Sequence, residues 1–242
     1  MSAGELVVVG VAVFSAALIQ VVAGFGFALL AVPVMTLAIP TRDAVVVTTL
    51  LGMGMSSWQA AHGRADTDWR LVRRLAIAAY AGMPFGLWVF VAVDDHVLRL
   101  MLGVAVLIAV GLLAFDVNLH HSGPALDVGA GFLSGVLNTS ISTNGPPLVF
   151  ALQARQLAPQ PFRSTITTVF ALSNLLGVTL FVAAGKVHRD GLVAAAIALP
   201  SLFVGQLVGF PLRRHVHGDR FRWLVLALMV VAAASAIVAA LT

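Results

Sequence analysis

Cysteine is absent from the 242 residues, and charged residues make up only 10% of them. Without cysteine, the chain can form no disulfide, no thiolate metal site and no cysteine nucleophile. A soluble domain carries roughly 25% charged residues, so this chain has too few polar side chains to cover a water-soluble surface. The 60% of hydrophobic residues instead indicate an all-α polytopic membrane protein, which has the lipid bilayer as a partner.

Charge is also scarce within the apolar runs, because Glu5, Asp43, Asp127 and Asp190 all lie near the ends of predicted segments. Intramembrane carboxylates are the usual proton relays, so a carboxylate-driven proton-coupled mechanism is disfavoured. The sequence offers no nucleophile–base pair, metal signature or nucleotide loop. We therefore predict no catalytic residues, no metal, no cofactor and no enzyme activity. Its basic residues lie in short loops, a pattern that does not indicate binding to nucleic acid.

Apolar runs between short polar loops place the predicted membrane segments. They cover about residues 6–23, 28–40, 45–61, 75–93, 98–115, 125–137, 148–152, 166–184, 192–212 and 223–241. The first two together exceed the roughly 20 residues that one span needs, and Gly24-Phe25-Gly26-Phe27 breaks them. The N-terminus lacks a basic leader with a small-residue cleavage site, so we expect the first segment to be structural.

The second half of the chain repeats landmarks of the first at an offset of about 114–124 residues. The corresponding pairs are Gly26…Pro33 with Gly145…Pro147, Arg42…Thr48-Thr49 with Arg163…Thr167-Thr168, and Asp94-Asp95 with Gly218-Asp219. We predict two repeats, residues 1–118 and 119–242, each with a broken or re-entrant first segment followed by three transmembrane helices. Whether that first segment re-enters or crosses twice stays open.

The basic loops predict the orientation of these repeats. Short cytoplasmic loops are enriched in Lys and Arg, and the two most basic loops, 64–74 and 213–222, occupy non-equivalent positions in the two halves. Placing both loops inside gives the repeats inverted topology and puts both termini outside. Inverted repeats with broken helices are a recurrent plan of secondary transporters, whose substrate site lies at the repeat interface.

The polar run 138–147, Asn-Thr-Ser-Ile-Ser-Thr-Asn-Gly-Pro-Pro, interrupts the apolar second half. Such chain survives at membrane depth only where protein or a wet cavity covers it, so it is either an external loop or the lining of a site. The paired break at Gly24–Phe27 favours a site lining. Because proline is favoured in a first helical turn, we expect a helix to begin at Asn144-Gly145-Pro146, with an N-terminus that favours anions.

We predict that a small anion binds where the two breaks meet, although some of these side chains are expected only to satisfy broken backbone. The candidate binding residues are Gly24, Phe25, Gly26, Gln59, Asn138, Thr139, Ser140, Ser142, Thr143, Asn144, Gly145, Pro146 and Asn174. Most other polar residues within spans, Gln20 among them, are expected to have no binding role. The histidines, including the pair His120-His121, are expected to be solvated loop residues.

Several short, glycine-based motifs carry a family resemblance. They are Gly24-Phe25-Gly26-Phe27…Pro33, Gly131-Phe132-Leu133-Ser134-Gly135, Gly145-Pro146-Pro147-Leu148-Val149, Phe162-Arg163-Ser164-Thr165, and Ser173-Asn174 before Gly185-Lys186-Val187. Over nearly the whole chain they resemble the sulfite exporter TauE/SafE family of bacterial membrane proteins. Similar proteins often have a Gly-rich break before Gly-Pro-Pro, and here it is richer in hydroxyl and amide groups.

The resemblance implies a transporter, usually an exporter, of sulfite or organosulfonates such as sulfoacetate across the bacterial inner membrane. It points to Gly24, Gly26, Asn144, Gly145, Pro146 and Asn174 as residues near the substrate path. Two alternatives stay open, an anion channel with the same lining and a non-transporting membrane subunit that scaffolds a partner. A homodimer is also an expected assembly.

Overall fold

The computed structural model describes residues 3–114 and 123–215, together with Ala227, Val230, Ala233, Ala234 and Ile237. Residues 115–122, which include His120-His121, and most of the predicted span 223–241 lie outside the described residues. Within the described part the chain is all-helical and has no strand. The predicted all-α class is therefore confirmed for this part of the chain.

The breaks between helices fall where glycine and proline predict them. The elements are α1 (Ala3–Ala23), α2 (Phe27–Met35), α3 (Thr41–Gly63), the 3-10 helix η1 (Arg64–Asp66), α4 (Trp69–Ala92), α5 (Asp95–Ala114), α6 (Pro124–Ile141), α7 (Gly145–Ala154), α8 (Pro159–Ala183) and α9 (Arg189–His215). By length and composition, four described stretches can cross a membrane: Gly4–Ala23, Trp69–Ala92, Pro159–Ala183 and Arg189–Leu212.

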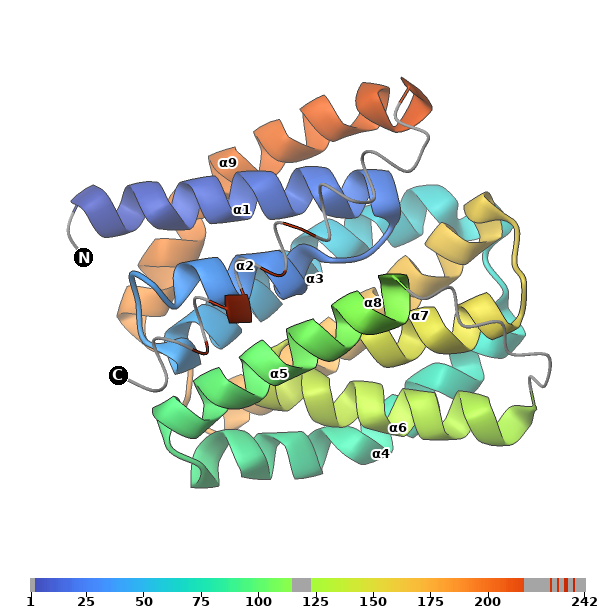
Figure 1. Cartoon of the computed structure of the whole chain (residues 1–242), viewed down its shortest axis with the longest axis horizontal. Coiled ribbons are helices and arrows are strands. Elements are labelled where there is room, and N and C mark those ends of the chain that lie inside the picture. Colours follow the sequence, from blue (N-terminus) through green and yellow to red (C-terminus); the bar gives the residue numbers. More distant parts are fainter. Residues whose placement is uncertain are drawn as a thin grey trace.

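The long helices lie roughly along one direction, so the bundle has two ends (Figure 1). At one end, α3 finishes at Gly63, and α4 and α8 begin at Trp69 and Pro159. We call it the basic-loop end. At the other, the Asp95 end, α3 begins at Thr41 and α5 begins at Asp95. In Figure 1, α1 and α6 run in opposite directions, as do α4 and α9.

Two helix pairs, α4 with α6 and α1 with α9, pack along their lengths. Glycines let these backbones approach, as in many membrane helix pairs. A Cβ added at Gly135 of α6 would overlap the carbonyl oxygen of Ala79 in α4, and one at Gly205 of α9 would come 2.6 Å from the carbonyl oxygen of Phe14 in α1. The third extensive pair is α3 with α8.

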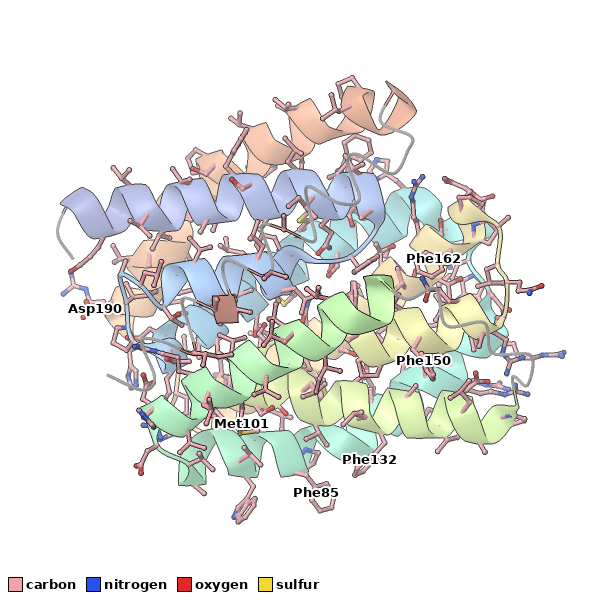
Figure 2. The ribbon with its side chains drawn as sticks, viewed as in Figure 1. Phe85, Met101, Phe132, Phe150, Phe162 and Asp190 are labelled. Atoms are coloured by element: carbon pink, nitrogen blue, oxygen red, sulfur yellow. The ribbon has the colours of Figure 1, made fainter. Side chains whose placement is uncertain are left out.

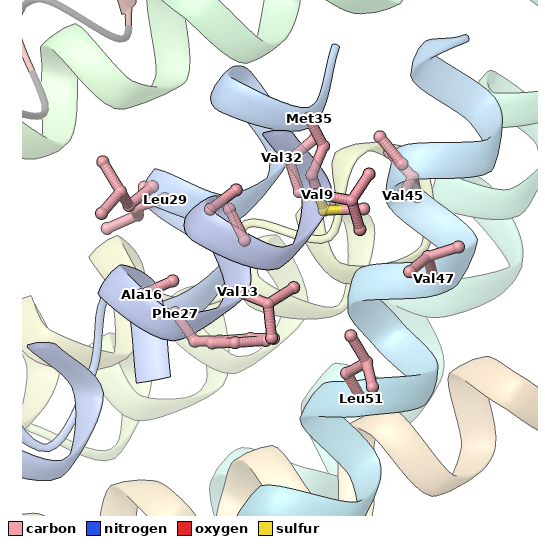
Figure 3. Close-up of a cluster of buried hydrophobic side chains, with 14 of the residues drawn as sticks. Val9, Val13, Ala16, Phe27, Leu29, Val32, Met35, Val45, Val47 and Leu51 are labelled. Atoms are coloured by element: carbon pink, nitrogen blue, oxygen red, sulfur yellow. The ribbon is translucent and has the colours of Figure 1, made fainter. Parts of the chain in front are cut away.

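The short helices α2 and α7 lie in the interior. Figure 3 shows α2 packed between α1 and α3, where Met35 of α2 and Val13 of α1 are fully buried. In α7, Leu148 and Leu152 are fully buried in a second apolar cluster that includes Leu75 of α4. The short helix that follows each break, α2 or α7, is thus packed against other helices through its apolar side chains.

Large apolar side chains cover the outside of the bundle. Phe85 of α4 is 59% exposed and points away from the helices in Figure 2, and its ring lies 5.7 Å from that of Phe132 in α6. Leu207 of α9 is 71% exposed. An apolar surface of this extent is unfavourable in water and suits contact with lipid.

Two predicted boundaries are wrong. The polar interruption covers only residues 142–144, because α6 continues to Ile141. Within α6, Ser140 donates its hydroxyl to the carbonyl oxygen of Val136, so this polar side chain is satisfied without leaving the helix. The chain between the predicted segments 148–152 and 166–184 is also more helical than expected, since α7 continues to Ala154 and α8 begins at Pro159, a residue type that favours the first turn.

Candidate functional site

The first helix break is a glycine turn between α1 and α2. Gly24 and Gly26 have φ of 89° and 104°, a left-handed conformation that costs other residues roughly 1–2 kcal/mol. The Gly24 N–H donates to the carbonyl oxygen of Gln20 at 2.7 Å and closes α1. The side chain of Gln20 then reaches α2, where its Oε1 accepts from the Phe27 N–H at 3.2 Å. One glutamine therefore caps both helix ends.

The second break is built with side chains. Ser142 ends α6 with φ of 59°, which is uncommon for a residue other than glycine. Thr49 of α3 donates its hydroxyl to the carbonyl oxygen of Val45 at 2.8 Å, so the Ser142 hydroxyl donates to Thr49 Oγ1 at 3.0 Å. Ser134 holds the next turn by donating to the carbonyl oxygen of Asn144 at 3.0 Å. Helix α7 begins at Gly145, as predicted.

The two breaks meet at a central cavity of about 20 Å³. It is lined by Gln20, Gly26, Phe27, Ala28, Leu29, Thr48, Gly52, Ser142, Thr143, Asn144, Gly145, Phe170 and Asn174. Thr143 and Asn144 are only 1% and 6% exposed. The alternative of an external loop is therefore wrong for this run, which lies in the protein interior.

Unpaired polar atoms distinguish the second break. Thr143 Oγ1 and Asn144 Nδ2 are buried and have no hydrogen-bond partner among the described residues. Leaving a buried polar group unsatisfied costs about 1–3 kcal/mol, which favours a ligand or water beside them. The carboxamide of Asn174 is oriented by Asn138, whose Nδ2 donates to Asn174 Oδ1 at 3.0 Å. This contact leaves Asn174 Nδ2 beside Gly52, on the cavity wall.

The central cavity contains six of the predicted residues and leaves out seven. Gly26, Ser142, Thr143, Asn144, Gly145 and Asn174 line it. Asn138, Thr139 and Ser140 lie behind the lining, where the Thr139 hydroxyl donates to the carbonyl oxygen of Met83 at 2.6 Å. The remaining four line neighbouring cavities: Gly24 and Gln59 a larger one of about 200 Å³ at the basic-loop end, and Phe25 and Pro146 one of about 10 Å³ beside α7.

Gln20 is one cavity-lining residue that sequence reasoning missed. It is 4% exposed and lines both the central cavity and the larger one. A signal was available, because Gln20 precedes the first glycine of the break by one helical turn, where a side chain can reach past the break to the next helix. Residue type alone does not reveal this reach, because it groups the glutamine with hydroxyl residues that bond to their own helix.

Charged side chains lie at the two ends of the bundle, away from the central cavity. At the basic-loop end, Asp127 is fully buried and accepts from Arg155 at 2.5 Å, with Arg74 at 3.6 Å. At the other end, Asp95 accepts from the Thr41 and Arg42 N–H groups at 3.2 Å and so caps α3. Asp127 was predicted near a helix end, but its complete burial arises from packing between α4, α6 and α7.

A membrane-embedded helical bundle with an uncharged internal cavity at paired helix breaks defines the class: a membrane transport protein. A family model described as "Sulfite exporter TauE/SafE" matches residues 9–236. The chain belongs to that family, which is one of membrane transporters and not a class of enzymes. The resemblance of its short motifs is thus confirmed. Within the described residues, no group of three or more His, Cys, Asp or Glu side chains could hold a metal ion.

Two curated proteins show the same relationship. The chain is 26% identical over 199 residues to "Probable sulfite/organosulfonate exporter TauE" of Cupriavidus necator, covering 78% of this chain and 77% of the relative. It is 27% identical over 112 residues to "Probable inner membrane transporter protein TsaS" of Comamonas testosteroni, covering 46% of this chain and 44% of that protein. No solved structure matches the chain.

Proposed function

We propose that this protein is a secondary transporter that exports small sulfur oxyanions, sulfite or organosulfonates such as sulfoacetate, across the bacterial inner membrane. The observation that carries the proposal is the meeting of two helix breaks at one uncharged cavity with unmet hydrogen bonds at Thr143 and Asn144. The named activity of the relative from Cupriavidus necator, sulfite or organosulfonate export, supports this substrate class.

The cavity recognises an anion without a fixed positive charge. The first residues of α2 and of α7 line the cavity, so the positive ends of both helix dipoles lie beside it. Asn144 Nδ2, Asn174 Nδ2 and the Thr143 hydroxyl add side-chain donors. Neutral donors bind an oxyanion less tightly than an arginine pair, because charge on both partners strengthens the bond. Release on the far side of the membrane is correspondingly easier.

Cavity size favours a transporter over a channel. A water molecule needs roughly 10–15 Å³, so the central cavity of about 20 Å³ accommodates one water and is too small for a sulfonate. Binding therefore requires the helices around the breaks to move. A site that must open on one side before it takes its ligand fits alternating access better than a continuous pore.

We also infer that residues 1–118 and 119–242 are inverted repeats. Helices α1 and α6 begin the two halves and run in opposite directions (Figure 1). In this repeat, α1 corresponds to α6 and α4 corresponds to α9. The α4–α6 pair therefore corresponds to the α9–α1 pair, and both pairs pack closely. The spacing Gly82…Gly86 in α4 recurs as Gly205…Gly209 in α9. With the basic-loop end in the cytoplasm, both termini lie outside.

The test is flux of sulfite and sulfoacetate into proteoliposomes that contain the purified protein. We expect saturable uptake, which Asn144→Leu removes because it eliminates a donor and fills the cavity. Thr179→Val is the matched control, since the Thr179 hydroxyl is exposed and bonds to the carbonyl oxygen of Leu175 in its own helix. Linear, non-saturating flux would instead identify a channel. No flux, with a stoichiometric partner in pull-downs, would identify a scaffold subunit.

A further inference from the structure

The larger cavity, which we call the vestibule, lies beside the central one at the basic-loop end. Its volume is about 200 Å³, an order of magnitude above that of the central cavity. His62 and Gln160 line it and are exposed, so the vestibule reaches the protein surface. It is therefore accessible in a conformation in which Thr143 and Asn144 of the central cavity are buried.

The polar groups of the vestibule suit an oxyanion. Arg163 of α8 is the one permanently charged side chain among the described residues that line it. A guanidinium presents a planar set of donors that matches the oxygens of a sulfonate or sulfite. Ser164 lies on the same wall and carries a hydroxyl group, whereas the hydroxyl of Thr167, also on this wall, donates to the carbonyl oxygen of Arg163. Gln59 Oε1 is buried there without a partner in the described part of the chain, so its carboxamide has an unmet hydrogen bond, and rotating the group would present its Nε2 donor.

Arg163 also touches the first helix break. A Cβ added at Gly24 would lie 2.8 Å from Arg163 Cγ, so the aliphatic stem of the arginine covers this turn. The backbone of Arg163 is held in place by Thr167, whose hydroxyl donates to its carbonyl oxygen at 2.7 Å. An anion held by Arg163 would therefore wait next to the turn that must move before the central cavity can open.

Gln20 separates the two cavities. It lines both, and its Oε1 accepts from the Phe27 N–H at 3.2 Å. An anion that passes from the vestibule to the centre must displace this oxygen, and the Phe27 N–H is then available to donate to the anion. The carboxamide oxygen of Gln20 thus occupies a position that an oxygen of the ligand can take.

We propose that the vestibule is a second binding site for the same small oxyanions, where Arg163 holds a sulfonate or sulfite before Gln20 yields and the anion enters the central cavity. This inference rests on the proposed transport of oxyanions and assigns Arg163 and Gln59 to a site separate from Thr143 and Asn144, with Ser164 on its wall. Gln20 is a positioning residue between the two sites.

The test uses thiol labelling, which does not depend on transport. Because the chain has no cysteine, Ser164→Cys places a single thiol in the vestibule of the full-length protein. We expect a sulfonate-bearing methanethiosulfonate reagent to label it in detergent micelles, and sulfoacetate to slow the labelling. Adding Arg163→Gln should raise the sulfoacetate concentration for half-protection roughly tenfold or more, the effect of losing a charged hydrogen bond. Arg163→Lys, which keeps the charge, should lose less.

Asn144→Leu distinguishes two sites from one. In the Ser164→Cys background it should leave sulfoacetate protection intact, because it alters only the central cavity. The proposal is overturned if Ser164→Cys is not labelled, if sulfoacetate gives no protection, if Arg163→Gln protects as well as the parent, or if Asn144→Leu abolishes protection. Failure of the proposed transport would appear separately, as absence of saturable flux, and the protection measurement would still report on the vestibule.

Discussion

The two helix breaks border the same cavity but are made of different groups. The first is a backbone turn, in which Gly24 and Gly26 adopt positive φ and the side chain of Gln20 is already bonded to the Phe27 N–H. What this break offers a ligand is therefore the positive dipole end of helix α2 at its N-terminus. This break supplies shape and dipole, and we expect substitutions in it to act first on folding.

The second break offers side chains instead. Ser142 donates its hydroxyl hydrogen to Thr49, whereas Thr143 and Asn144 line the cavity and each has a buried polar atom without a partner among the described residues. We expect substitutions at these two residues to act first on ligand binding. We therefore expect ligand specificity to depend on the half of the chain that contains the polar run, and the shape of the cavity to depend on the glycine turn in the other half.

The largest predicted effect concerns how the short helices are anchored. Helix α7 is tied at its end by Arg155, which pairs with the fully buried Asp127, while the described part of α2 carries no charged residue. Removing one partner of a buried pair costs about 3–5 kcal/mol. Because Arg155 and Arg74 partly reach solvent, we expect the lower end of this range for Asp127→Asn, measured by unfolding in mixed micelles.

A double variant controls for the uncompensated charge. Asp127→Asn with Arg155→Gln should unfold at a smaller loss of free energy than Asp127→Asn alone, since less unpaired charge remains beside the buried site. Equal losses in the single and double variants would show that α7 is held by packing and not by this pair.

The next effect separates binding from stability at the second break. Thr143→Val keeps the shape of the side chain and removes a hydroxyl that has no partner within residues 3–114 and 123–215. We expect unchanged or slightly higher stability, and oxyanion binding weaker by about 1.5–3 kcal/mol, the usual value of a hydrogen bond to a charged group. The measurement is the concentration of sulfoacetate that gives half-maximal flux in proteoliposomes.

Thr139→Val is the matched control, because this neighbouring hydroxyl bonds to the carbonyl oxygen of Met83 and lies behind the cavity wall. It should lower stability by about 1 kcal/mol with little change in the half-maximal concentration. The reverse pattern, binding lost at Thr139 and stability lost at Thr143, would contradict the assignment of ligand contacts.

At the first break we expect a substitution to lower stability more than ligand binding, the opposite of Thr143→Val. Gly24→Ala places a side chain at φ of 89° and brings its Cβ to 2.8 Å from Arg163 Cγ, so we expect a loss of about 1–3 kcal/mol of stability. Gly54→Ala in α3 is the control, since a Cβ there meets no described atom within 4 Å. Thermal unfolding of both variants checks this, and similar melting temperatures would show that the turn tolerates other conformations.

The sequence located both breaks because glycine and proline act locally. The Gly24…Gly26 pair and Gly145-Pro146-Pro147 determine where helices end and begin whatever surrounds them. The sequence pattern overestimated the length of the second break, because hydroxyl side chains such as Ser140 can bond within a helix. It also missed that Gln20 and Arg163 face cavities, since the direction of a side chain depends on how distant helices pack.

The smallest predicted effect concerns Ser142, where two local terms oppose each other. Ser142→Gly relieves the left-handed conformation at φ of 59°, a gain of about 1 kcal/mol, but loses the hydrogen bond to Thr49, a cost of about 0.5–1.5 kcal/mol. We therefore expect a change in unfolding free energy near zero. Thr49→Val tests the same bond without touching the backbone, and it should destabilise by about 1 kcal/mol. If Ser142→Gly destabilised as strongly as Gly24→Ala, the second break would depend on its backbone as much as the first does, and the contrast between the two breaks would be lost.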